Sequence, residues 1–188
     1  MQLVDLADPP IDLVDLSRAI RRSSNFSFAS VFFQYDDANP TSLRGALAVF
    51  DAIVETPAFE RSLRETWVAD YRKTLEVGRR EKHAVLVPAE GHLENVLASA
   101  SLDQAGAYSR AVRDATGPQR DEVAALFRHL GDYLAFELVS RPDPACRTCG
   151  YNSHLFSTWF YGVAWDWCFF VVWPAAKVAG VVCLTDTD

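Results

Sequence analysis

Positive charge is scarce in this sequence. Lys and Arg number 18 against 25 Asp and Glu, which gives a formal net charge of −7. Nonspecific nucleic-acid binding depends on clustered Lys and Arg that neutralise phosphates. We therefore expect no nucleic-acid partner. The acidity is compatible with a basic protein partner, or with a solvated surface that binds nothing.

Several catalytic signatures are also missing. The chain has no HExxH metal motif, no GxSxG nucleophile elbow, no phosphate-binding glycine loop and no dinucleotide fingerprint. His92 follows Glu90 and Gly91 and could join a carboxylate, but no nucleophile stands beside it in the sequence. These absences favour a binding protein over an enzyme.

The N-terminus lacks the features of a signal peptide. It is rich in Asp, and no basic residue precedes Arg18, so there is neither a positive n-region nor a clean apolar h-region. We expect a cytoplasmic protein, in which cysteines stay reduced. All four cysteines lie in the last quarter of the chain.

The stretch from Leu155 to Leu184 dominates the apolar content of the chain, and only Asp166 and Lys177 carry charge within it. The part from Leu155 to Trp173 has about the length of a membrane span. However, Asp166 would lie near the bilayer centre, and Trp and Tyr would be spread through the depth instead of lying at the interfaces. Aromatic and β-branched residues, with a turn at Pro174, favour strands instead. We therefore predict strands and no membrane partner.

The last two of these strands are predicted to form a hairpin. Residues 165–173 are apolar on both faces, which is typical of a central strand in a sheet covered on both sides. A turn centred between Ala175 and Ala176 would place Cys168 opposite Cys183 and Asp166 opposite Thr185. A three-residue turn would shift this register by one and separate the cysteines.

The most specific local motif is a CxxC in the Pro-rich loop before the aromatic stretch. Cys146 and Cys149, followed by a glycine, resemble a zinc knuckle, but a structural zinc site needs four ligands. His154 is a further candidate ligand, as are Cys168 and Cys183 if the hairpin approaches the loop. A redox dithiol and plain structural thiols are the alternatives. Asp166, between two tryptophans, is the one candidate catalytic acid or base.

These patterns predict an α+β fold with a helix-rich body packed on a small, mostly antiparallel sheet that includes the aromatic C-terminal hairpin. We expect a single domain, 1–188, with a helical body to about residue 140, a Cys-containing loop at 141–154 and an aromatic strand region at 155–188. The predicted strands are 26–35, 84–87, 156–163, 165–173 and 178–185. The predicted helices start near residues 8, 43, 57, 90, 102 and 118. The helix from residue 57 is predicted to continue through Leu75. The helix from residue 118 has an apolar stripe from Val123 through Leu138 and is predicted to end at Ser140.

For function, we expect a small acidic protein that binds a protein partner through an acidic or aromatic surface. An immunity-type or antitoxin-type inhibitor of a basic toxin is one setting that fits its size and charge. The alternative is a zinc-binding or thiol-based enzyme centred on the CxxC loop and Asp166. We expect no cofactor in the first case and zinc in the second.

Overall fold

The computed structural model describes the chain in eight segments, and each structural statement below concerns these segments only. They are residues 1–6, 26–36, 38–66, 74–78, 84–101, 117–140, 156–160 and 166–186. The helices predicted to start near residues 8 and 102 lie outside them, as does the CxxC loop.

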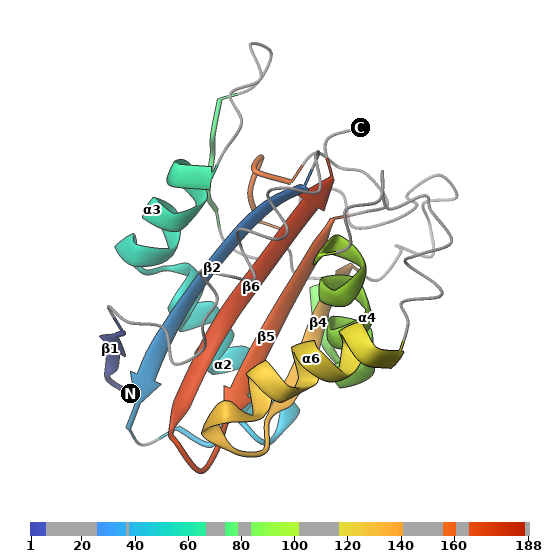
Figure 1. Ribbon diagram of the computed structural model, residues 1–188. Helices are drawn as coiled ribbons and strands as arrows, with labels where there is room; N and C mark the ends of the chain where they lie inside the picture. The colour runs from blue at the N-terminus through green and yellow to red at the C-terminus, as the bar shows by residue number, and fades with distance from the viewer. Residues whose placement is uncertain are drawn as a thin grey trace, which may run out of the picture.

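The described segments form an α+β fold, in which four α-helices pack on a six-stranded antiparallel sheet of strand order β1-β2-β6-β5-β4-β3 (Figure 1). The strands are β1 (Leu3–Asp5), β2 (Phe26–Tyr35), β3 (Ala84–Pro88), β4 (Leu134–Ser140), β5 (Trp167–Trp173) and β6 (Val178–Asp186). The helices are α2 (Leu43–Val54), α3 (Pro57–Thr66), α4 (Glu90–Ser101) and α6 (Gly117–Phe127), followed by the 3-10 turn η1 (Arg128–Leu130). This is the predicted fold class, with more strands than the sequence pattern indicated.

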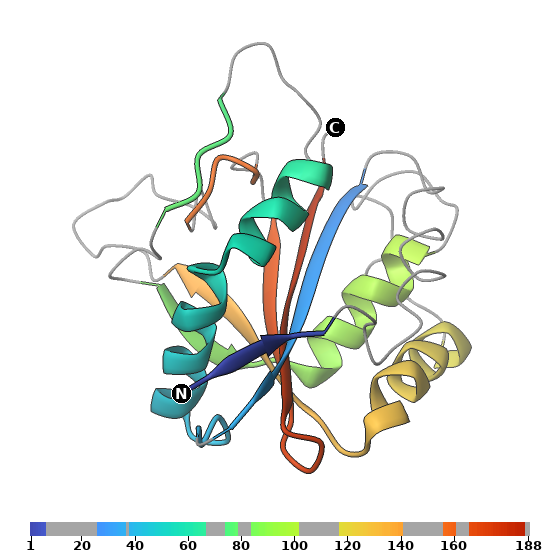
Figure 2. The ribbon, with the colours of Figure 1, turned by 90° about the vertical axis from the view of Figure 1, so that its left-hand side faces the viewer.

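Helices cover both faces of the sheet. Figure 2 shows the sheet nearly edge-on, with α2 and α3 on one side and α4 and α6 on the other. Each side has its own apolar cluster against the sheet. Every residue of β5 is buried, and β5 lies between β4 and β6. The prediction of a central strand with both faces covered is therefore confirmed.

Two helices begin at residues whose side chains cap them. The hydroxyl of Ser42 accepts a hydrogen bond from the backbone N–H of Gly45 at the start of α2. The hydroxyl of Thr56 accepts one from the N–H of Phe59, and Pro57 occupies the first position of α3. Both starts were predicted, because a cap satisfies a donor that the first helical turn leaves unpaired.

The predicted helix through Leu138 is wrong. α6 ends at Phe127, and after η1 the chain turns at Gly131, whose φ is 100°, into strand β4. Leu130, Leu134 and Leu138 are four residues apart, a spacing that puts side chains on one side of a helix and also on one face of a strand. Pairing with β3 and β5 makes the segment a strand, so its alternate side chains lie on opposite faces of the sheet. Leu138 packs in the α2–α3 cluster and Ala135 in the α4–α6 cluster.

Two further predictions fail at a contact between distant segments. The helix predicted to continue to Leu75 is absent over residues 74–78, which are not helical. In the described part of the strand predicted from Phe156, residues 156–160, the pairing is one isolated bridge between Ser157 and Val77. Around this bridge, the hydroxyl of Thr158 donates to the carbonyl of Thr74. A contact between segments about 80 residues apart leaves no periodic pattern in either segment.

The sheet also contains a close approach that only glycine permits. Gly180 on β6 lies directly opposite Phe32 on β2. A Cβ at position 180 would lie 2.2 Å from the Phe32 ring and 2.7 Å from the carbonyl oxygen of Val31. The Phe32 ring covers the glycine and contacts the Trp173 ring, with centroids 5.8 Å apart.

We predict that Gly180→Ala destabilises the protein by about 1–3 kcal/mol, because the methyl group must displace both a packed ring and a backbone carbonyl. Chemical denaturation of both proteins measures the difference. Gly91→Ala is the matched control: Gly91 lies on α4 with open space around its Cβ position, so this change should be neutral or stabilising. Equal stability of Gly180→Ala and wild type would contradict the prediction.

Candidate functional site

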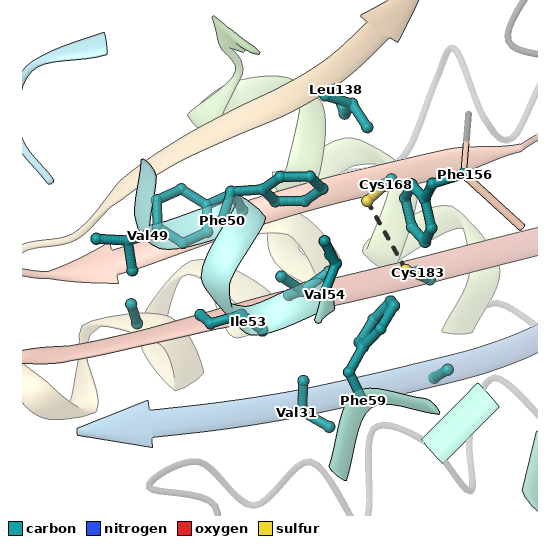
Figure 3. Close-up of a cluster of buried hydrophobic side chains, with 14 of the residues drawn as sticks. Val31, Val49, Phe50, Ile53, Val54, Phe59, Leu138, Phe156, Cys168 and Cys183 are labelled. Carbon is teal, nitrogen blue, oxygen red and sulfur yellow. Dashed lines mark hydrogen bonds between the residues drawn. The ribbon is translucent and has the colours of Figure 1, made fainter. Parts of the chain in front are cut away.

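Cys168 and Cys183 face each other across the β5–β6 hairpin, as the register with a turn centred between Ala175 and Ala176 predicts. Their sulfurs lie 3.8 Å apart, and the Cys183 thiol donates to the Cys168 sulfur. Both residues are fully buried in the cluster beneath α2 and α3 (Figure 3). Burial and the contact with Cys183 raise the pKa of the Cys168 thiol well above its usual range. Because both thiols are fully buried, a metal ion or an oxidant reaches them only when the surrounding side chains open locally.

Asp166 lies opposite Thr185 at the far end of the same hairpin. The Thr185 hydroxyl donates to the Asp166 carboxylate at 2.5 Å, and both residues have no exposed surface. This contact was predicted from the register. A buried carboxylate needs such donors, because burial without them is costly. The described conformation holds the Asp166 carboxylate away from solvent, where a substrate would have to be.

The remaining predicted ligands cannot be compared with the structure. Cys146, Cys149 and His154 lie outside the described residues, and their assignment as metal ligands stays a prediction. Within the segments that are described, no three His, Cys, Asp or Glu side chains gather closely enough to hold a metal ion.

A half-buried acid–base pair lies on the opposite face of the sheet. The side chain of Glu137 on β4 is 14% exposed, and its Oε2 lies 3.7 Å from Nε2 of His92 on α4, which is 46% exposed. The His92 ring also contacts the Phe169 ring, at a centroid distance of 5.8 Å. Burial raises the pKa of Glu137 to about 7 and lowers that of His92. Glu137 therefore exchanges a proton near neutral pH.

Glu94 lies on α4, the helix that carries His92, and two neighbouring side chains contact its carboxylate. The Tyr133 hydroxyl donates to Oε1 of Glu94 at 2.6 Å, and Arg128 lies 3.6 Å from the same oxygen. Burial, followed by the contact with Glu94, raises the pKa of Tyr133. Tyr133 is therefore a neutral donor at physiological pH. Together with Glu90, whose carboxylate lies 3.4 Å from the backbone N–H of Ala135, these groups join α4 to the start of β4.

No protein-family model, curated protein or solved structure matches this chain. None of the helices in the described segments is both long and apolar enough to cross a bilayer. The chemistry of the described surface is therefore the main guide to function.

The sequence contained one signal for the Glu137 site. Glu137 is the only charged residue in Leu134–Ser140, and a lone carboxylate in a buried apolar segment points to a special environment. A helix has a solvent-exposed face that can hold a Glu, so a lone Glu in the predicted helix would need no special environment. The carboxylate that lies beside His92 in the structure is that of Glu137.

We predict that Glu137 makes the protein more stable as the pH falls. Its pKa is about 7 in the folded protein against an ordinary 4.5, so the folded state binds more protons between these values. Above pH 7 the ionised Glu137 carboxylate lowers the free energy of unfolding, and this destabilisation disappears as the pH falls toward 4.5. Glu137→Gln removes the ionisation. The variant should exceed wild type in free energy of unfolding by up to about 3 kcal/mol at pH 8, and this advantage should shrink toward pH 5.

Denaturant unfolding at several pH values measures this difference. Glu65→Gln is the control, because Glu65 is exposed on α3 on the other side of the sheet. The difference between that variant and wild type should stay nearly constant with pH. A constant difference for Glu137→Gln as well would show that Glu137 has an ordinary pKa.

Proposed function

We propose that this protein binds a basic protein partner through the side of the molecule formed by α4, α6 and the start of β4. The observation that carries the proposal is an uneven distribution of charge between the two helical layers. Immunity-type and antitoxin-type inhibitors of basic toxins are the setting that this chemistry fits. Acidic surfaces steer basic partners by long-range attraction and suppress binding of acidic ones.

The α4–α6 side has an excess of carboxylates among its described residues. Its acidic residues are Glu90, Glu94, Asp121, Glu122 and Asp132, with the less exposed Glu137 ionised only in part near neutral pH, and its arginines are Arg120 and Arg128. The α2–α3 side is nearly balanced, with Asp51, Glu55, Glu60 and Glu65 against Arg44, Arg61 and Arg64. A basic partner is therefore attracted more strongly to the α4–α6 side.

Aromatic residues do not support a binding surface in the described segments. Trp159 and Trp173 have no exposed surface, and Trp167 is 6% exposed. Of the acidic and aromatic surfaces expected from the sequence, the acidic one is the better supported. Asp121 and Glu122 are exposed on α6, where neither is tied into the hydrogen bonds that hold α4 to β4. They are therefore suited to a test that leaves the fold intact.

The test compares two double variants in binding to a partner captured by the full-length protein. Asp121→Asn/Glu122→Gln removes two charges from the proposed surface, and Glu60→Gln/Glu65→Gln removes two from α3. We expect a stoichiometric, basic partner whose affinity falls as salt rises, and about three- to tenfold weaker binding for the α6 variant. The α3 variant should bind as wild type does.

Two results would overturn the proposal. One is the absence of any stoichiometric partner under low-salt conditions. The other is a partner that binds the two double variants equally, because attraction to the α4–α6 side would then have no effect.

The alternative function is zinc binding or thiol chemistry in the CxxC loop. It rests on the spacing of Cys146 and Cys149, with His154 as a third candidate ligand. The burial of Cys168, Cys183 and Asp166 favours a site made within the loop over one that includes the hairpin. We expect this alternative to give one zinc per chain in metal analysis of reduced protein, and none after Cys146→Ser/Cys149→Ser. Absence of stoichiometric zinc in wild type would remove it.

A further inference from the structure

The buried pair of cysteines has a geometry that goes beyond packing. Cys168 and Cys183 are directly opposed on two antiparallel strands, and their sulfurs already lie 3.8 Å apart. Directly opposed residues in such a sheet have Cα atoms about 4.5–5.5 Å apart. Disulfides span Cα distances of about 4.4–6.8 Å. The backbone is thus already placed for a bond, and rotation of the two side chains is the movement that remains.

We propose that Cys168 and Cys183 form a reversible cross-strand disulfide that locks the β5–β6 hairpin when the protein is exposed to peroxide. This inference does not rest on the proposed partner binding. Figure 3 shows the two sulfurs pointing toward each other between the strands, with Phe156 beside Cys168 and Phe59 and Val54 on the side of Cys183.

The chemistry needs one oxidant and is balanced. One thiol gives up its proton, and its sulfur attacks a peroxide oxygen; the O–O bond breaks, leaving a sulfenic acid and one water. The second sulfur then attacks the sulfenic sulfur, the S–O bond breaks, and a second water leaves with the remaining thiol proton. Two thiols and one hydrogen peroxide therefore give one disulfide and two waters. A dithiol reductant reverses the bond by thiol–disulfide exchange.

The surroundings of the pair determine how the reaction proceeds. Both sulfurs are enclosed by apolar side chains, so a small uncharged oxidant such as hydrogen peroxide is better suited than a bulky charged disulfide. The reaction should be slow, because it depends on local opening of the cluster under α2 and α3. Once one sulfur is oxidised to sulfenic acid, the other sulfur is the nearest nucleophile, so the disulfide should form before the sulfenic acid accumulates.

The experiment uses full-length protein with Cys146→Ser/Cys149→Ser, so that Cys168 and Cys183 are the remaining thiols. The reduced protein is treated with hydrogen peroxide below its unfolding transition, denatured, alkylated and analysed by mass spectrometry. We expect a product lighter than the reduced chain by two hydrogen atoms, which takes up no alkylating reagent, and a peptide pair that joins positions 168 and 183. Its unfolding midpoint should rise and return to the original value after dithiothreitol.

A matched variant with Cys183→Ala added isolates the role of the partner sulfur. This variant should accumulate a singly oxidised Cys168 and show no rise in midpoint. The proposal is overturned if both thiols of the parent remain alkylatable. It is also overturned if oxygen atoms accumulate on single sulfurs without closure, or if the links form only between separate chains. In wild-type protein, a bond from Cys168 or Cys183 to Cys146 or Cys149 in preference to the cross-strand bond would equally contradict it.

Discussion

Burial of β5 on both faces is the constraint on which the rest of the structure depends. A strand without a polar face must have strands on both sides and a covering layer above and below. β4 and β6 supply the neighbours, and the α2–α3 and α4–α6 layers supply the covers. Trp173 at the end of β5 holds the α4–α6 layer against the sheet. Its Nε1 donates to the carbonyl oxygen of Phe127 at 2.5 Å, and its ring stacks on the Phe127 ring.

Three polar or reactive features interrupt this apolar interior, and each is accommodated differently. Asp166 is sealed and receives a hydrogen bond from Thr185, while the two thiols are sealed against each other. Glu137 alone keeps partial contact with solvent, and its neighbour His92 is half exposed. Burial without a strong partner raises the pKa of Glu137 to about 7, so it exchanges a proton near neutral pH. It does so beside the acidic surface to which we assign partner binding, which couples the charge of that surface to pH.

The sequence predicted best those features that depend on interactions between residues close together in the chain. The turn at Pro174 lies between two apolar runs, so the sequence predicted the hairpin and left two registers open. The structure has the one that pairs Cys168 with Cys183. Ser42 and Thr56 likewise mark helix starts, because a cap acts within one turn. The helix predicted through residues 134–140 is wrong, because a spacing of four fits both a helix and a strand. Strand β1 was not predicted, because its three residues form a strand by pairing with β2.

By itself, then, the sequence determined the fold class and the central aromatic hairpin, and it reduced the contacts across that hairpin to two registers, because these features depend on residues close together in the chain. Only the tertiary structure decided that Leu134–Ser140 is a strand, since its pairing with β3 and β5 supplies the hydrogen bonds that a helix would have made internally. The same pairing brings Glu137 against His92, 45 residues earlier in the chain. No local pattern encodes that distance, and so the acid–base pair and the acidic side of the molecule emerge only when the sheet is assembled.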